Sequence, residues 1–170
     1  MGRWTLPFLL SLCLIPSLSQ AKDLRSRVGV GVTQQTSDIP TLSIKYGLPT
    51  AEKSVNIQLE AVGGAEMLPG DQISAVAGLR VLYGVVAEDN MNLYAGAGVL
   101  SVLMNADDSP QFTGVRIQPV FGAEFFPYGL ENLGLSLEGG VSVDIGEDGA
   151  GFSTRPGSHP LAGFGFHYYF

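Results

Sequence analysis

The residues able to do chemistry are few and stand apart from one another. The chain holds two histidines, His159 and His167, and one cysteine, Cys13. Ser158 directly precedes His159, but neighbours in sequence do not by themselves form the nucleophile–base contact that a hydrolase needs. His167 lies in an alternating segment, where a hydrogen-bonded interior residue is the expected role. We therefore expect no catalytic site and no bound cofactor.

Two other patterns bind ligands in some proteins and are weak in this chain. Glycine pairs such as Gly29-Val-Gly31 are followed by no predicted helix and no Gly-Lys-Ser/Thr sequence, so they are not nucleotide-binding loops. Asp107-Asp108 and Glu147-Asp148-Gly149 fall in predicted loops, but their spacing does not match an EF-hand loop. Solvated acidic loops are the favoured interpretation, and a loosely held divalent cation is the alternative. The sequence predicts no resident metal.

The first 21 residues have the pattern of a secretory signal peptide. Arg3 supplies a positive charge, Leu6–Ile15 an apolar run, and Ser19-Gln20-Ala21 the small residues that a signal peptidase reads. The apolar run is shorter than the roughly 20 residues of a membrane-spanning helix. We expect cleavage after Ala21 and a single domain over residues 22–170.

The predicted mature chain of 149 residues is acidic and free of thiols. Without Arg3 it holds eight Lys and Arg against sixteen Asp and Glu, a net charge of about −8. Binding to phosphate backbones needs clustered Lys and Arg, so this balance argues against nucleic acid as a partner. The only cysteine leaves with the signal peptide, so no disulfide is expected.

Period-two alternation dominates residues 22–170, and no window shows the apolar period of a helix. In Val55–Gly63, for example, valine, isoleucine, leucine and alanine alternate with asparagine, glutamine and glutamate. Consecutive alternating segments joined by Gly-, Pro-, Asn- and Asp-rich turns predict an all-β fold, an antiparallel up-and-down β-barrel of about eight strands. The expected strands are Arg27–Thr33, Thr41–Gly47, Val55–Gly63, Ile73–Val86, Met91–Met104, Thr113–Phe126, Leu133–Ile145 and Ala162–Phe170.

The face opposite the apolar side chains carries about one charge per strand, and three cations nearly balance four anions. Facing lipid, each Lys or Arg would cost roughly 2–4 kcal/mol near the bilayer midplane. Facing inward, the cations can pair with the acids in an interior just wide enough for side chains to fill. We therefore predict a transmembrane barrel with an internal charge network made of Lys45, Glu60, Arg80, Arg116, Glu124, Glu138 and Asp144, with His167 beside it.

Two other kinds of protein are compatible with the same alternation of apolar and polar residues. A soluble, lipocalin-like periplasmic carrier would turn the apolar face inward, but its surface would usually be about a quarter to a third charged. Here Gly, Ser, Asn and Gln dominate the polar face. A narrow ion pore would use the same inward charges as a selective lining, and it is less favoured because eight strands rarely leave an open channel.

The connections fit a membrane topology with both termini on the periplasmic side. The expected periplasmic turns are Gly47–Ser54, Glu88–Asn90 and Pro127–Asn132, and the expected outer loops are Gln34–Pro40, Gly64–Asp71, Asn105–Phe112 and Gly146–Pro160. Pro119 lies in the middle of a predicted strand, where it removes a ladder hydrogen bond. We expect a local bulge or kink there.

The last segment, Ala162–Phe170, alternates to the very end, with Phe164, Phe166, Tyr168 and Phe170 on one face. On this pattern the chain resembles the small eight-stranded outer-membrane β-barrels of Gram-negative bacteria, the group of the OmpA transmembrane domain and OmpX/Ail. The resemblance implies a bacterial outer-membrane location, contact with membrane lipid and lipopolysaccharide, and a structural or surface-interaction role. It also implies that the four aromatic residues are the signal read by the barrel assembly machinery. We expect a monomer.

Some small outer-membrane barrels are lipid-A-modifying enzymes, which makes this activity a further alternative. A lipid A deacylase would need a His-x-Ser sequence on a strand with an acidic partner. Here His159 is followed by Pro160-Leu161 and His167 by Tyr168-Tyr169, so the motif is absent. The sequence therefore favours a protein that is not an enzyme.

Overall fold

The computed structural model describes residues 22–34, 39–52, 55–68, 72–106, 109–146, 149–153 and 163–170. The described part of the chain contains no helix long and apolar enough to cross a membrane. Its strands are β1 (Val28–Thr33), β2 (Thr41–Gly47), β3 (Ile57–Leu68), β4 (Gln72–Glu88), β5 (Met91–Ala106), β6 (Ser109–Phe125), β7 (Leu133–Gly140), β8 (Ser142–Gly146), β9 (Gly149–Ser153) and β10 (Gly163–Tyr169). Residues 1–21, which the sequence predicts to be a signal peptide, and the Ser158-His159 pair lie outside the described residues.

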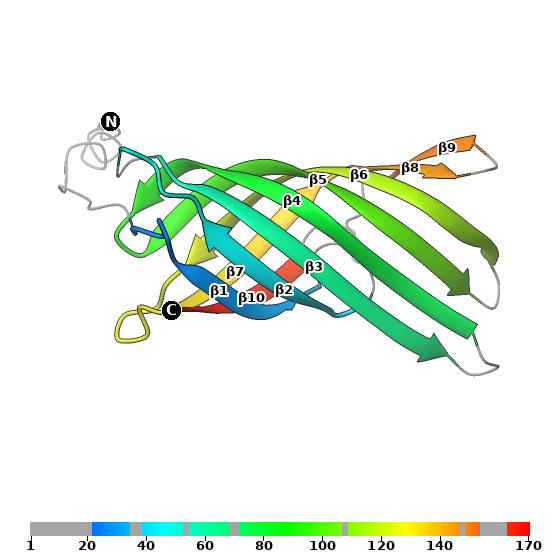
Figure 1. The fold of residues 1–170 in the computed structure, drawn as a ribbon, viewed down its shortest axis with the longest axis horizontal. Coiled ribbons are helices and arrows are strands. Elements are labelled where there is room, and N and C mark those ends of the chain that lie inside the picture. The colour runs from blue at the N-terminus through cyan, green and yellow to red at the C-terminus, as the bar shows by residue number, and fades with distance from the viewer. Residues whose placement is uncertain are drawn as a thin grey trace, which may run out of the picture.

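These segments form a closed, antiparallel, up-and-down barrel of eight strands (Figure 1). Each of β1 to β6 is one barrel strand. The seventh strand is β7 followed by β8, both paired with β6, and the eighth consists of β9, paired with β8, and β10, paired with β7 and β1. Pairing of β10 with β1 and of β5 with β6 leaves the ring without a break, which confirms the predicted fold class.

The register of the strands fixes the dimensions of the barrel. Starting from Val30 on β1, successive cross-strand partners through β2 to β6 lead to Val143 on β8. In the other direction, Val30 leads through Tyr168 to Leu133 on β7. These end points are ten residues apart on the same strand, so the shear number is ten. With a rise of 3.3 Å per residue and strands 4.8 Å apart, this gives a tilt of about 40° and a radius of about 8 Å.

Pro119 lies on β6, the sixth barrel strand, and interrupts its pairing with the seventh strand without shifting the register. Val120 pairs with Gly140 on β7 and Ile117 pairs with Val143 on β8, in one continuous register. Between these pairs, the Val141 N–H donates to the Pro119 carbonyl at 3.2 Å, but Pro119 has no N–H to donate in return. Of the bulge or kink expected at Pro119, the bulge is therefore wrong. One ladder bond is missing, and on the partner strand β7 ends before Val141 and β8 begins after it. The register shifts that do occur lie between Gly84 and Val86 and between Met104 and Ala106.

The two faces of the strands match the predicted parity. The outward row through Val30 consists of apolar residues all round the barrel: Val30, Ile44, Ala61, Leu79, Val99, Ile117, Val143, Leu133 and Tyr168. On the other parity, residues such as Lys45, Glu60, Arg80, Glu124 and Glu138 are buried. The apolar residues therefore face outward and the charged residues face the lumen.

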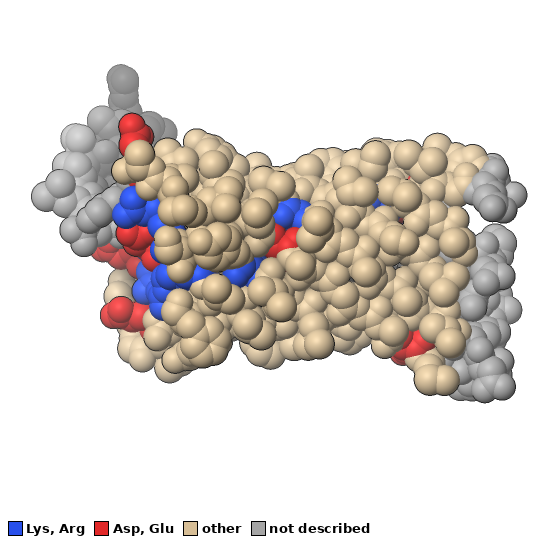
Figure 2. Space-filling model, in the orientation of Figure 1, with Lys and Arg blue, Asp and Glu red and all other residues tan. Residues whose placement is uncertain are grey.

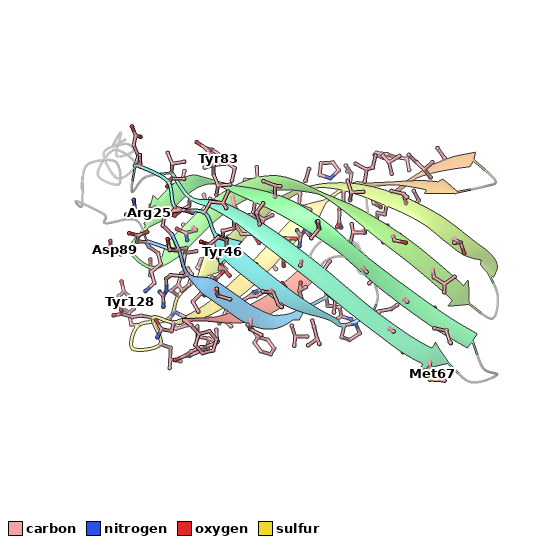
Figure 3. All side chains as sticks on the ribbon, in the orientation of Figure 1. Arg25, Tyr46, Met67, Tyr83, Asp89 and Tyr128 are labelled. Carbon is pink, nitrogen blue, oxygen red and sulfur yellow. The ribbon has the colours of Figure 1, made fainter. Side chains whose placement is uncertain are left out.

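Several expected loops are shorter than predicted, because the hairpins continue past the glycines and polar residues that suggested their ends. β3 runs to Leu68 and β4 begins at Gln72, so most of the predicted loop Gly64–Asp71 is strand. Most of the predicted loop Asn105–Phe112 is likewise strand, and Gly146–Pro160 contains β9. Figure 3 shows Met67 at the end of the barrel opposite the termini, called the far end below. Arg25, Asp89 and Tyr128 lie at the end that carries Phe170.

Candidate functional site

The inward charged residues come from neighbouring positions of the strand ladder. Lys45 on β2 is the cross-strand partner of Glu60 on β3, which in turn is the partner of Arg80 on β4. All three are at most 1% exposed. Charges at this depth are stable only when they are paired and hydrogen-bonded. The structure supplies the partners mostly from the opposite wall.

Arg80 joins three strands. Its Nη1 lies 3.0 Å from Glu60 Oε2 on the adjacent β3, and its Nη2 donates to Glu138 Oε2 on β7 across the lumen. The Tyr94 hydroxyl of β5 donates to the other oxygen of Glu138, Oε1, at 2.8 Å. The Glu138 carboxylate is thus shared by a guanidinium and a phenol, and β4, β5 and β7 are tied together at one height.

Lys45 makes the second link across the lumen. Its Nζ donates to Glu124 Oε1 on β6 at 3.2 Å, although Glu124 is far from Lys45 along the ladder. The Tyr169 hydroxyl of β10 lies 2.9 and 3.0 Å from the two oxygens of the same carboxylate. Glu124 therefore connects β2, β6 and β10.

His167 lies between these two ion-pair groups. Its Nε2 is 2.8 Å from Ser43 Oγ, and the Ser43 hydroxyl donates to Glu60 Oε1 at 2.6 Å. Because the hydroxyl proton points to Glu60, the imidazole Nε2–H is the donor to Ser43. Its Nδ1 is 3.8 Å from Glu124 Oε1. His167 is thus connected to the Glu60 group through Ser43 and lies beside the Glu124 group without a hydrogen bond to it.

Ser43, His167 and Glu124 have the residue types of a hydrolytic triad, but their surroundings do not suit catalysis. Ser43 is 1% exposed and His167 is fully buried. The Ser43 proton is committed to Glu60, which leaves His167 as a donor rather than as the base that activates a nucleophile. The pair connects strands of the barrel instead of meeting a substrate.

Arg116 and Asp144 form a separate ion pair. They are direct cross-strand partners on β6 and β8, with Arg116 Nε at 2.6 Å and Nη2 at 3.0 Å from the two carboxylate oxygens. The Asp144 side chain is 22% exposed, unlike the acids of the main group. The eight residues predicted to share a network therefore lie in two places: six in one connected group, and this pair nearer the far end.

The lumen glycines make room for the long side chains. A Cβ on Gly98 would lie 2.5 Å from Arg80 Cγ, and one on Gly122 would lie 2.7 Å from Glu138 Cγ. A Cβ on Gly29 would lie 2.7 Å from the Tyr169 ring. In each of these pairs the glycine is the direct cross-strand partner of the large residue. The lumen is therefore filled by matching a long side chain to an adjacent glycine.

The lumen also contains apolar layers that the sequence reasoning missed. One buried cluster, toward the end of the barrel opposite the termini, consists of Val62, Val76, Leu100 and Val102. Another, closer to the termini, consists of Leu82, Tyr94 and Val120. A third cluster, Leu24, Phe126 and Tyr169, lies at the end that carries the termini. Ser43 and Tyr94 are buried on the same parity as the inward charged residues, but nothing in the sequence marks them as hydrogen-bond partners.

No group of three or more His, Cys, Asp or Glu able to hold a metal occurs among the residues that the structure describes. The acidic pairs Asp107-Asp108 and Glu147-Asp148 fall outside those residues. At the C-terminus, Phe164, Phe166, Tyr168 and Phe170 all point outward and are 48–73% exposed, and the Tyr168 and Phe170 rings make an edge-to-face contact at 5.1 Å.

Comparison with known proteins gives one structural relative. The N-terminal β-barrel domain of Pseudomonas aeruginosa OprF matches 86% of this chain and 98% of its own length, with a TM-score of 0.53 and 14% sequence identity. No protein-family model and no curated protein sequence matches the chain. At this identity the likeness concerns the fold, and it agrees with the eight-stranded barrel expected from the sequence.

Replacing Arg80 with Leu should destabilise the barrel strongly, because it leaves Glu60 and Glu138 buried without their cation. Removing one partner of a buried ion pair typically costs about 3–5 kcal/mol. Urea unfolding of the protein in lipid vesicles measures this loss. The control is Arg116→Leu, which breaks the more exposed pair and should cost clearly less. Equal losses for the two variants would show that the main group has no special dependence on its burial.

Gly98→Ala should also destabilise, because the new methyl group overlaps Arg80 Cγ and lies 3.3 Å from the Leu79 carbonyl oxygen. Overpacking of this kind costs about 1–3 kcal/mol. The matched control is Gly63→Ala on β3, where a Cβ meets nothing within 4 Å. The same unfolding assay compares them. A loss at Gly63 as large as that at Gly98 would mean that general strand effects, not contact with Arg80, set the cost.

Proposed function

We propose that this chain is an integral outer-membrane β-barrel protein with a structural or surface-interaction role, a closed polar lumen and no enzymatic activity. The observation that carries the proposal is the division of the barrel wall into an uncharged outer face and a charged inner face. The OprF barrel domain adds support at the level of fold.

The height of the apolar outer face suits a bacterial outer membrane. On β4 the outward residues from Ile73 to Tyr83 are all uncharged, and Leu79 near their centre is 70% exposed. At a tilt of about 40°, these eleven positions rise about 25 Å along the barrel axis. The apolar band of outer-membrane barrels is about 25 Å tall. Tyr83 and Tyr46 lie toward the end of the barrel that carries the termini (Figure 3), where interfacial tyrosines are expected.

The apolar outer face of the barrel also disfavours a soluble carrier protein. Large apolar side chains exposed on the wall include Leu42, Ile44, Leu79, Val99, Phe121, Phe164 and Phe166. A continuous apolar surface of this extent marks contact with a membrane or a partner rather than with water. On the face seen in Figure 2, the charged residues gather toward the end that carries the termini, and the rest of the described surface is mostly uncharged.

The contents of the lumen favour a closed barrel over an ion pore. Fully buried side chains, among them Lys45, Arg80, Glu60, Glu124 and Gln118, occupy its middle. Apolar clusters lie on both sides of them along the barrel, Val62 with Leu100 on one side and Leu24 with Phe126 on the other. A barrel whose backbone lies about 8 Å from its axis has room inside for such side chains and little else.

The expected partners follow from this location. Membrane lipid and lipopolysaccharide would contact the outer face, and the exposed C-terminal residues Phe164, Phe166, Tyr168 and Phe170 would be presented to the barrel assembly machinery. No contact that joins two copies of the chain is needed to complete the barrel, in keeping with a monomer.

Leu79→Arg tests the proposal. Placed near the middle of the apolar band, arginine should lower the free energy of unfolding in lipid vesicles by about 2–4 kcal/mol. The control is Met67→Arg on the neighbouring strand, at the far end of the barrel (Figure 3), where the cost should be about 0–1 kcal/mol. Folding is followed by the shift in gel mobility on boiling. If the unmodified protein is extracted into water from membranes and Leu79→Arg is neutral, the proposal is wrong.

A further inference from the structure

The segment Lys22–Arg27, before β1, lies across the end of the barrel. Leu24 is fully buried and packs with Phe126 and Tyr169. The Lys22 N–H donates to the Glu88 carbonyl at the end of β4 at 3.1 Å, and the Asn56 side chain donates to the Lys22 carbonyl at 3.2 Å. The segment thus starts beside β3 and β4 and ends at β1.

The other end of the segment is fastened to β2. The Ser26 N–H donates to the Gly47 carbonyl at 2.8 Å, and Arg25 Nη1 donates to the Thr50 carbonyl at 2.9 Å. Gly47 is necessary for this approach, because a Cβ there would lie 1.8 Å from the Leu24 carbonyl oxygen. The barrel end is therefore shaped to receive this segment.

Leu24 packs against Tyr169, which borders the charged part of the lumen. Its neighbour Tyr169 donates its hydroxyl proton to Glu124, the carboxylate that pairs with Lys45. Gln58 Oε1 lies 3.4 Å from the same hydroxyl. If Leu24 moved out of this cluster, water could reach Tyr169 and Gln58 and, beyond them, the ion pairs.

The segment is held by dispersed contacts and not by the continuous ladder of a strand, since β1 begins only at Val28. Ser26 has a φ of 58°, a left-handed conformation that is unfavourable for a residue with a side chain. The Lys22–Glu131 pair is long, at 3.8 Å, and the Glu131 side chain is 80% exposed. Surface pairs of this kind contribute little. Besides Leu24 and the hydrogen bonds of Lys22, Arg25 and Ser26, Arg27 Nη2 donates to Asn132 Oδ1 at 2.7 Å and to the Tyr169 carbonyl at 3.2 Å. The Lys22 ammonium lies 5.3 Å from the centre of the Phe126 ring. All of these contacts lie at the edge of the barrel.

We propose that Lys22–Arg27 is a displaceable stopper of the barrel end that carries the termini, with Leu24 as its plug. Seated, it keeps water from Tyr169 and the ion pairs; displaced, it opens the lumen from that side alone. This inference rests on the proposed membrane barrel, whose periplasmic end this would be.

Thiol labelling of the protein in lipid vesicles tests the stopper. The full chain carries Cys13→Ser to remove its own thiol, and Gln58→Cys reports access to the lumen below Leu24. The probe is a small water-soluble maleimide. Adding Leu24→Asp should raise the labelling rate at least tenfold, because a carboxylate is unfavourable in the apolar cluster, and Leu24→Ala should raise it by a smaller factor. Ser26→Gly should lower the rate, since glycine adopts the left-handed conformation without strain.

The control reporter is Val102→Cys, buried toward the far end of the lumen, whose labelling should not respond to changes at Leu24. The gel-mobility shift on boiling shows in every variant whether the barrel is folded. A folded Leu24→Ala or Leu24→Asp barrel with an unchanged Gln58→Cys rate would overturn the stopper, as would a parallel rise at Val102→Cys. Absence of the gel shift in the chain with Leu24 and Ser26 intact would instead count against the membrane barrel itself.

Discussion

The narrow, closed interior is the constraint on which the rest of the structure depends. Eight strands with a shear number of ten give a radius of about 8 Å, and strand geometry sends every second residue into that space. Each inward residue must therefore fit its neighbours and each inward charge must find a partner. The placement of Gly98 beside Arg80, and of Gly122 beside Glu138, follows from this limit.

Each inward charge finds its partner in an ion pair, and some of these pairs connect strands that are not neighbours in the sheet. Arg80 on β4 reaches Glu138 on β7, and Lys45 on β2 reaches Glu124 on β6. Such pairs do not make the barrel more stable than well-packed apolar residues would, because desolvation offsets most of their attraction. They specify register instead, since a slip of one residue would expose all of these charges to the outer face. The same charges that make the lumen polar thus fix the outside as apolar.

The sequence predicted the strand parity and the inward position of all eight network residues, because alternation is a local property. It did not predict which residues meet across the lumen, since that depends on the shear number and on the registers of distant strands. Arg116 and Asp144 accordingly lie apart from the other six. Val62 and Leu100 are apolar but lie on the inward face, which is otherwise mostly polar. Strand β3 continues through Gly63-Gly64, where the two glycines suggested a turn. Gly64 is instead suited to the close approach of the Pro40 carbonyl. The segment Lys22–Arg27 has no alternation, so only the structure shows its place.

The most direct test of the account compares the two faces of one wall at the same height. Phe121 points outward from β6 and Tyr94 points inward from the adjacent β5, where they pair with Ala95 and Gly122. In a chain carrying Trp4→Phe, which removes its only tryptophan, Phe121→Trp and Tyr94→Trp each introduce a single fluorophore. In vesicles with brominated acyl chains, we expect strong quenching of the tryptophan at position 121 and little at position 94. Equal quenching at both positions, or stronger quenching at 94, would contradict an apolar wall facing lipid around a polar lumen.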